Sequence, residues 1–263
     1  MRKKILLFVL LMLIGNRAWA EQTPWTVINK KTVVRGEWVI RWPVVVNESG
    51  KLAIKAGSRI RFELSPDPKG RDVAGITIHG ILEIQGTEDQ PVTLAMDKPF
   101  PEFAAIKIES ESQSKILFAR FTAVNFGLHI HFSPVLVESC RFEKNQAAVK
   151  LRSGRVILQD NLFTGNHTAI RFWYGDPVIV GNRFIDNQTG IFVRGGVKKP
   201  IIAGNSFNNR KYDIKLSESQ NHDLKAINNR WRSNDSDIIR NYIYDRRKSD
   251  YLGLVEIKPV INE

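Results

Sequence analysis

Two cations in this sequence stand at a spacing that could serve chemistry. Lys150 and Arg171 occupy corresponding positions in two short alternations of apolar and polar residues, AAVKLR and TAIRFW. A neighbouring cation lowers the pKa of a lysine, which can then act as a base, and a guanidinium can bind a carboxylate or sulfate through parallel hydrogen bonds. If the fold stacks these two side chains, they could bind an acidic polymer or remove a proton from it.

His129 and His131 offer a second kind of chemistry, metal binding. On a strand, residues two apart point to the same face, as pairs of ligands do in some zinc sites. A third ligand is missing, because the neighbouring outward positions are expected to hold Lys107, Lys150 and Ala148, and cations repel a metal ion. We therefore expect no metal and no cofactor, and we expect the two rings to contact solvent or a sugar.

Carboxylates are scattered through the repeats rather than paired. Hydrolysis of a glycosidic bond generally needs two facing carboxylates, and calcium-dependent lyases need several converging acidic oxygens. The acids that can be aligned stand alone in their columns: Glu109, Asp160, Asp186 and Asp213. This pattern argues against a glycosidase. Cys140 is the single cysteine, so there is no internal disulfide, and its thiol is expected to be packed.

These side chains must be positioned by an internal repeat. Its most regular member is a large aromatic residue, which recurs at steps of 21, 21, 21, 23 and 24: Phe121, Phe142, Phe163, Phe184, Phe207 and Trp231. Asparagines recur two residues before this anchor and three residues after it: Asn161, Asn182, Asn205 and Asn229, then Asn145, Asn166 and Asn187. Several columns that repeat together indicate a solenoid.

Within each repeat, short runs rich in Val, Ile and Phe alternate with period two and are separated by Asn and Gly. Period two is typical of strands, and Asn and Gly can supply left-handed backbone corners. The sequence predicts an all-β fold, a right-handed parallel β-helix of about 8 coils that stack at roughly 4.8 Å. Its predicted parts are a signal peptide (1–20), an N-terminal cap (21–37), the β-helix (38–231) and a C-terminal capping tail (232–263).

One outward sheet face is predicted to carry the cations. If Ile130 and Phe132 point inward, the residue between them points outward, and its column reads Lys107, His131, Lys150, Arg171, Phe192 and Lys215. The adjacent outward column reads Glu109, Ser133, Arg152, Trp173, Arg194 and Ser217. The predicted ligand-binding residues are His129, His131, Lys150, Arg152, Arg171, Trp173, Phe192, Arg194 and Lys215. Because arginines pair with carboxylate or sulfate and aromatic rings stack on sugars, this face suits an anionic glycan.

Two segments carry a resemblance to a known group: the stretch VVVNESGKLAIKAGSRIRF, and the element Asn228-Asn229-Arg230-Trp231 with Asp250, Gly253 and Pro259 after it. The chain resembles the right-handed parallel β-helix superfamily with pectate-lyase-like folds, and more narrowly bacterial exported β-helix repeat proteins of unassigned activity. Some lyases of this superfamily use a Lys base and an Arg acid on adjacent coils beside calcium ligands. The resemblance implies those roles for Lys150 and Arg171, although the flanking coil offers histidines instead of acids.

The N-terminus predicts export. Three basic residues precede an apolar run from Ile5 to Ile14, and the small residues Ala18 and Ala20 suit cleavage after residue 20. The run is too short to span a bilayer, and no later stretch is long enough, so no transmembrane segment is expected in the mature chain. Removal of residues 1–20 lowers the formal charge from +12 to +8, which favours acidic partners.

We therefore predict a periplasmic or secreted protein that is non-catalytic. It would bind acidic polysaccharide or a cell-envelope glycan, or act as a scaffold, and export makes nucleic acid the least expected acidic partner. Two alternatives stay open: a lyase of uronic-acid polymers that uses Lys150 and Arg171, and a periplasmic metal-handling accessory protein.

Overall fold

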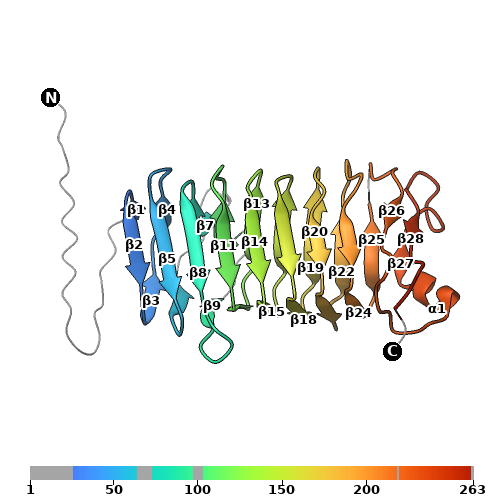
Figure 1. The fold of residues 1–263 in the computed structure, drawn as a ribbon, viewed down its shortest axis with the longest axis horizontal. Coiled ribbons are helices and arrows are strands. Elements are labelled where there is room, and N and C mark those ends of the chain that lie inside the picture. The colour runs from blue at the N-terminus through green and yellow to red at the C-terminus, as the bar shows by residue number, and fades with distance from the viewer. Residues whose placement is uncertain (1–25, 64–72, 97–102, 218, 262–263) are drawn as a thin grey trace.

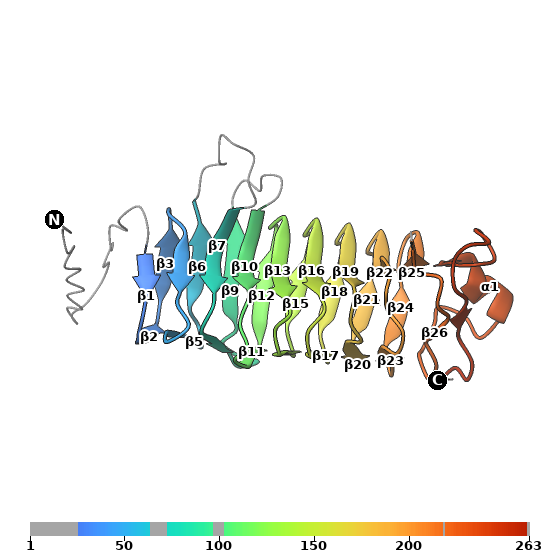
Figure 2. The ribbon, with the colours of Figure 1, turned by 90° about the horizontal axis from the view of Figure 1, so that it is seen from above.

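Three parallel sheets run the length of the molecule (Figures 1 and 2). The computed structural model describes residues 26–63, 73–96, 103–217 and 219–261. From β1 to β24, successive strands join sheet A, then B, then C, so each turn of the chain adds one parallel strand to every sheet. The predicted parallel β-helix is confirmed, and sheets B and C each have eight strands.

The strands are short and occupy three repeating positions. Sheet A contains β1 (Thr26–Ile28), β4 (Val44–Val46), β7 (Val73–Ile78), β10 (Phe103–Ile108), β13 (Phe126–His131), β16 (Ala147–Arg152), β19 (Thr168–Trp173), β22 (Thr189–Val193), β25 (Tyr212–Leu216) and β27 (Ile243–Tyr244). Sheet B contains β2 (Lys31–Val34), β5 (Lys51–Lys55), β8 (Ile81–Gln85), β11 (Ser114–Leu117), β14 (Val135–Glu138), β17 (Val156–Gln159), β20 (Val178–Val180) and β23 (Ile201–Ala203). Sheet C contains β3 (Glu37–Ile40), β6 (Arg59–Phe62), β9 (Val92–Met96), β12 (Ala119–Thr122), β15 (Arg141–Glu143), β18 (Leu162–Thr164), β21 (Arg183–Ile185) and β24 (Ser206–Asn208).

The aromatic anchors form a continuous stack inside the coil. Phe142 lies 4.9 Å from the Phe163 ring centroid at an interplanar angle of 9°, and Phe163 lies 5.1 Å from Phe184 at 5°. The stack continues in both directions, from Phe121 at one end to Trp231 at the other. These centroid distances are close to the separation of hydrogen-bonded strands. The parallel register therefore places equivalent side chains directly above one another, as the spacing of the repeat predicts.

Buried asparagines form ladders at the corners between strands. At the corner from sheet B to sheet C, the Oδ1 atom of Asn182 accepts from the backbone N–H of Asn161, and its Nδ2 donates to the carbonyl of Leu158. The residue in the left-handed conformation is the one before each asparagine, such as Asp160 (φ 53°) or Gly181 (φ 67°). The expectation that Asn and Gly supply this conformation holds at Gly181 and Asn228 (φ 55°), but not for the ladder asparagines themselves, because their side chains are needed inside to satisfy the backbone.

The first coil begins earlier than the predicted boundary at residue 38. Residues 26–28 pair with β4 in sheet A, residues 31–34 pair with β5 in sheet B, and residues 37–40 pair with β6 in sheet C. Most of the segment assigned to an N-terminal cap is thus part of the winding itself. Residues 21–25 of that segment, and the predicted signal peptide, lie outside the described residues.

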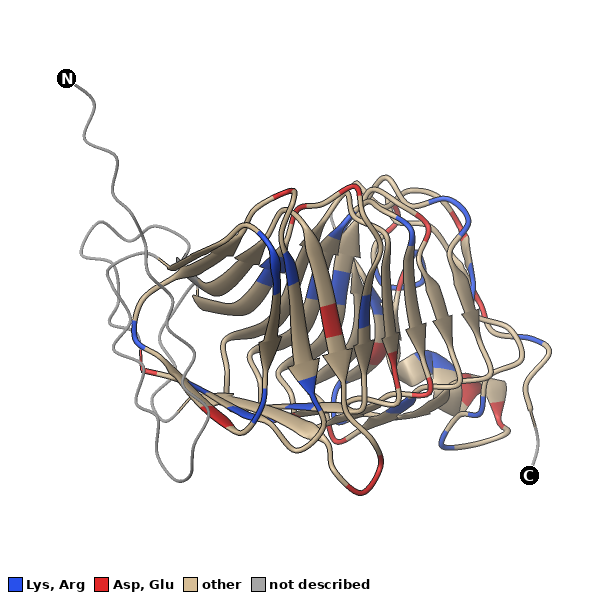
Figure 3. Ribbon diagram, turned by 60° about the vertical axis from the view of Figure 1, so that its left-hand side comes forward, with Lys and Arg blue, Asp and Glu red and all other residues tan. Residues whose placement is uncertain are grey.

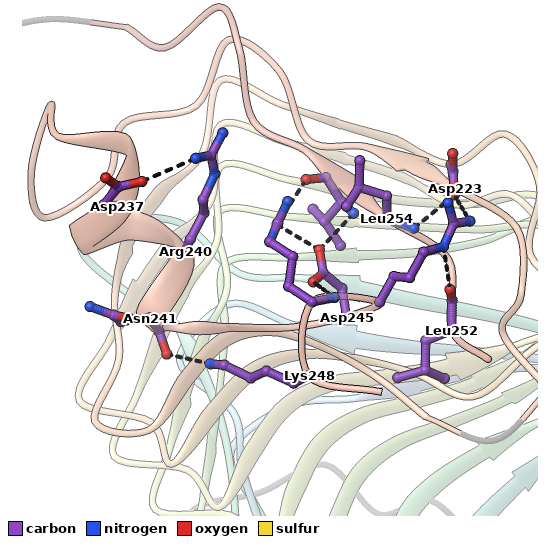
Figure 4. A network of polar contacts seen from close by, with 11 residues as sticks. Asp223, Asp237, Arg240, Asn241, Asp245, Lys248, Leu252 and Leu254 are labelled. Atoms are coloured by element: carbon purple, nitrogen blue, oxygen red, sulfur yellow. Dashed lines mark hydrogen bonds and ion pairs between the residues drawn. The ribbon is translucent and has the colours of Figure 1, made fainter. Parts of the chain in front are cut away.

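The C-terminal tail packs onto the last coils (Figure 1). Helix α1 (Ser236–Asn241) buries Ile239, and β27 adds a last strand to sheet A, while β26 (Leu224–Lys225) pairs with β28 (Val255–Glu256). Asp245 organises this end, because its buried carboxylate accepts from Arg247 at 2.6 Å and from the N–H of Val255 at 2.9 Å (Figure 4). Of the helices that the structure describes, none has the length and apolar character needed to cross a membrane.

Candidate functional site

The register of sheet A corrects the predicted columns. Leu128 and Ile130 are the inward pair of β13, both fully buried, whereas Phe132 is 63% exposed with φ of 51°. Phe132 lies at the left-handed turn after the strand, so its side chain points to solvent despite its apolar type. The assignment of Ile130 and Phe132 as the inward pair was therefore wrong by two residues. His129, rather than His131, pairs with Lys107 and Lys150.

Two outward columns of sheet A contain all nine predicted ligand-binding residues. The middle column reads Lys107, His129, Lys150, Arg171, Phe192, Lys215 and Tyr244. The outer column has His131, Arg152 and Trp173 in register, with Arg194 at the next equivalent position. Ser133, which was expected here, is instead fully buried, and its hydroxyl accepts from the backbone N–H of Ser110.

We call seven of these residues the basic–aromatic face: Lys150, Arg152, Arg171, Trp173, Phe192, Arg194 and Lys215. Trp173 lies at its centre. The cationic groups of Lys150, Arg171 and Arg194 lie 5.9, 6.0 and 5.9 Å from Trp173 ring centres. Arg171 is also 5.6 Å from Phe192, and Lys215 is 5.3 Å from the same ring. Cation–π attraction of this kind offsets the repulsion between cations stacked in adjacent strands.

The sequence did not lead us to predict the aromatic residues at the margins of this face. The Lys150 ammonium lies 4.6 Å from the Phe126 ring, and the Arg152 guanidinium lies between Phe132 and Tyr174, at 5.5 and 5.8 Å. Phe126 and Tyr212 lie on the third outward column of the same sheet. Counting in steps of one repeat leads from Phe132 to Tyr174 and from Phe126 to Tyr212. The repeat could therefore have predicted that these aromatic residues lie beside the cations.

Among the residues that the structure describes, acidic side chains are rare in the outward columns of sheet A. In the three outward columns of sheet A, within the described residues, Glu109 is the one acidic side chain, and it follows β10, two strands before the basic–aromatic face begins. The resulting positive potential is strongest from β16 onward, where cations occupy both the middle and the outer column. Figure 3, in which sheet B faces the viewer, shows that Lys and Arg also lie along strands there, with Asp and Glu among them.

Glu109, His131 and His129 form a hydrogen-bonded chain beside the face. A Glu109 oxygen lies 3.1 Å from Nδ1 of His131, and Nε2 of His131 lies 2.7 Å from Nε2 of His129. The carboxylate favours a proton on Nδ1 of His131, so its Nε2 can accept from His129 when both rings are neutral. Burial lowers the pKa of His129 to about 3, and Lys150 next to it acts in the same direction.

The two histidines therefore bind each other rather than converge on an ion. Among the residues that the structure describes, no group of three or more His, Cys, Asp or Glu side chains could hold a metal. Lys107 forms an ion pair with Glu109 at 2.9 Å, so this carboxylate already interacts with both Lys107 and His131. This arrangement gives no support to the metal-handling alternative.

The His129 environment predicts a loss of stability in acid. The unfolded chain would protonate this histidine near pH 6.5, whereas the folded protein keeps it neutral down to about 3, so unfolding takes up a proton between these values. We expect the free energy of unfolding to fall by about 3 kcal/mol from this residue alone as the pH drops from 7 to 4. Urea unfolding of wild type and His129→Gln at both pH values measures the difference.

His167→Gln serves as the control for this prediction, since His167 is exposed in the turn between β18 and β19, two coils away from His129. It should keep the acid sensitivity of the wild type. Equal pH dependence in wild type and His129→Gln would show that the neutral, buried state of His129 is not what acid disrupts.

Cys140 is a packed thiol, as expected. It occupies the asparagine position of its coil, receives the N–H of Ala119 at 3.3 Å, and is almost completely buried. Burial raises the pKa of the Cys140 thiol to about 12, so it stays protonated and unreactive at neutral pH.

Lys150 and Arg171 are direct neighbours in adjacent strands, as the lyase alternative requires. The acidic calcium ligands that accompany such a pair in the resembling lyases have no counterpart among the described columns around them. The geometry therefore brings together a potential base and a potential acid, but leaves out the group that would make a substrate proton acidic.

Comparison with known proteins supports the fold. The family described as right-handed β-helix region matches residues 104–231, which includes every residue of the basic–aromatic face. No curated protein matches the chain. No solved structure matches it either. The family description names no substrate, so any function has to come from the side chains themselves.

Proposed function

The chain is a right-handed parallel β-helix, and we propose its function from sheet A: the protein binds an acidic polysaccharide or cell-envelope glycan, without catalysis. The family description that matches residues 104–231 names no activity. The observation that carries this proposal is the basic–aromatic face. Together with Tyr244 of β27, it presents cations and rings on five successive strands of sheet A, from β16 to β27. A glycan chain that lay along the helix axis would meet a new cation or ring at each strand, roughly every 4.8 Å.

The chemistry of the two side-chain types is complementary. Guanidinium groups bind carboxylate or sulfate through paired hydrogen bonds, and the apolar faces of sugar rings stack on aromatic side chains. Trp173 is half-buried among three cations, which fixes its ring without covering it. A rigid aromatic residue with charges around it loses little conformational entropy when a ligand binds.

Binding should depend on the cations of this face and on salt. We expect the double variant Arg152→Gln/Arg194→Gln to bind acidic glycans about tenfold more weakly at low ionic strength, because two charge-assisted contacts are lost. A glycan array probed at low and high salt, followed by titration with the best acidic ligand, measures this. The matched control is Lys115→Gln/Arg155→Gln, which removes the same charge from exposed positions near sheet B.

Equal weakening in both double variants would show that the protein attracts anions through its net charge alone. Binding that stayed unchanged in Arg152→Gln/Arg194→Gln would remove the face from the proposal. A neutral glycan as the best ligand would do the same, because the cations would then have no role.

The direct pairing of the Lys150 and Arg171 strands favours one second candidate, a lyase of uronic-acid polymers. Cleavage by β-elimination creates an unsaturated sugar that absorbs ultraviolet light. Incubation of the protein with polyuronates, with and without calcium, tests this candidate against Lys150→Gln. Absorbance that grows with wild type and not with the variant would replace the binding proposal with catalysis.

We also propose that the protein is exported to the periplasm or beyond. The support is the basic start, the apolar run from Ile5 to Ile14 and the small residues before Glu21. Mass spectrometry of the protein from a periplasmic fraction should find a mature chain that begins at Glu21. An intact N-terminus in the cytoplasmic fraction would contradict export.

A further inference from the structure

A second candidate site lies at the corner between sheets B and C, away from the outward columns of sheet A. A groove of about 320 Å³ runs there across successive coils, from the loop between β8 and β9 to the start of β21. Its lining includes three arginines, one leucine and two acids: Arg120, Arg141, Arg183, Leu162, Asp160 and Glu88. None of the basic–aromatic face takes part in it.

The three arginines belong to one column of sheet C. Arg120 pairs with Arg141, Arg141 with Leu162, and Leu162 with Arg183, so these side chains stack on consecutive strands. Arg141 and Arg183 are exposed, and Arg120 is half-buried. None of the three has an ion pair or a side-chain hydrogen bond with a described residue. Stacked guanidinium groups without partners leave donor groups available to an anionic ligand.

The spacing of the arginines is set by the fold. Neighbouring strands lie about 4.8 Å apart, so Arg120 and Arg141 are one such step apart, and Arg141 and Arg183 are two steps, about 10 Å, apart. A linear chain with regularly placed acidic groups can meet such a column in several registers. A single small anion would use at most two of the arginines.

The two acids narrow the ligand class. Glu88 and Asp160 lie in the same groove, and Asp160 is held by a hydrogen bond from the Gln159 amide at 3.1 Å. A ligand made of anionic groups alone would be repelled by these carboxylates. A chain that carries both carboxylates and hydroxyls would satisfy the whole lining, because hydroxyls donate to carboxylates.

We propose that this groove binds a linear polyuronate, with sugar carboxylates on Arg141 and Arg183 and sugar hydroxyls donating to Asp160 and Glu88. The site goes beyond the function proposed for sheet A, because it uses a different side of the coil and different side chains. The two sites can therefore fail independently.

Loss of the exposed arginines gives the first test. Oligogalacturonate should bind the full-length double variant Arg141→Gln/Arg183→Gln at least tenfold more weakly at this site in isothermal titration. The matched control is Arg155→Gln/Arg210→Gln, which removes two exposed arginines elsewhere. Titration of Arg152→Gln/Arg194→Gln in parallel reports on sheet A. Loss in the groove variant alone would support the groove and would leave the sheet A proposal to its own glycan-array test. Unchanged binding in the groove variant, or an equal loss in the Arg155→Gln/Arg210→Gln control, would overturn the groove proposal.

A gain of binding gives a test that misfolding cannot imitate. Leu162 interrupts the arginine column, so Leu162→Arg should complete it and raise the affinity for oligogalacturonate several-fold. Ile157→Arg adds the same charge to an exposed position of β17 in the same coil, on the outer face of sheet B. An equal gain in both variants would reduce the effect to net charge and overturn the proposal.

Substitution of Asp160 distinguishes a ligand that carries hydroxyl groups from a polyanion that has none. If its carboxylate accepts sugar hydroxyls, Asp160→Asn should weaken oligogalacturonate binding, whereas inorganic polyphosphate should bind this variant more tightly because a repulsive charge is gone. Asparagine tolerates the left-handed backbone at this position (φ 53°), so the fold should be kept. Tighter binding of both probes would show that Asp160 only repels, and would contradict the assignment of a polyuronate.

Discussion

Asn182→Leu should destabilise the protein by about 4 kcal/mol, the cost of several unpaired buried polar groups. In the native ladder, Oδ1 of Asn182 accepts from both the backbone N–H and the side-chain amide of Asn161, at 3.0 and 2.9 Å. Its own amide donates to the carbonyl of Leu158 at 2.8 Å and to Oδ1 of Asn205 at 3.0 Å. Leucine has a similar volume but offers none of these contacts, so donors and acceptors of two neighbouring coils lose their partners without access to water.

Urea unfolding followed by circular dichroism measures this effect, with Asn208→Leu as the control. Asn208 is exposed at the end of β24, so its replacement should change the free energy of unfolding by less than about 0.5 kcal/mol. If Asn182→Leu cost no more than Asn208→Leu, the ladder would be a by-product of the repeat rather than a source of stability.

The core could be predicted from the sequence because the repeat itself encodes it. A parallel coil stacks residues at a constant interval, so any column that recurs once per repeat must share one environment. Phe142, Phe163 and Phe184 obey this interval without exception, and the structure stacks them. The first coil was assigned too late because residues 21–37 were expected to cover the open strand edges of the first coil rather than to form strands themselves.

The candidate site was harder to predict because side-chain type and direction disagreed at one position. Phe132 is apolar and follows Ile130 at the spacing of an inward pair, yet the strand ends at His131 and the next residue is left-handed. One repeat before Val149 and Leu151 stand Leu128 and Ile130, the pair that the structure buries. In a solenoid, the repeat interval predicts the direction of a side chain better than its hydrophobicity does, since each residue must match its neighbours in the coils above and below.

Contacts between side chains of different columns could not be predicted from the sequence. The chain from Glu109 through His131 to His129, and the arrangement of three cations around Trp173, depend on side-chain directions within one face. The column of arginines in the groove is regular in sequence, but Leu162 breaks it, and its importance appears only when the corner beside it is seen to be hollow.

Phe163→Ala should cost between about 3 and 5 kcal/mol, the usual range for a fully buried phenylalanine. Phe163 lies in the middle of the stack with no exposed surface, and the rigid backbone ladders above and below it leave little room for collapse. Phe132→Ala is the control, because that ring is 63% exposed and should contribute little. Denaturant unfolding of both variants measures the difference.

The size of the loss also distinguishes packing from ring attraction. The centroid distances within the stack, 4.9 and 5.1 Å around Phe163, follow the strand spacing, so volume and burial should account for most of the effect. Phe163→Leu keeps most of the volume and should therefore cost much less than Phe163→Ala. A double-mutant cycle of Phe142→Leu with Phe163→Leu should give a coupling of about 1 kcal/mol. A coupling as large as the whole Phe163→Ala loss would show that ring stacking, and not the register of the backbone, holds successive coils together.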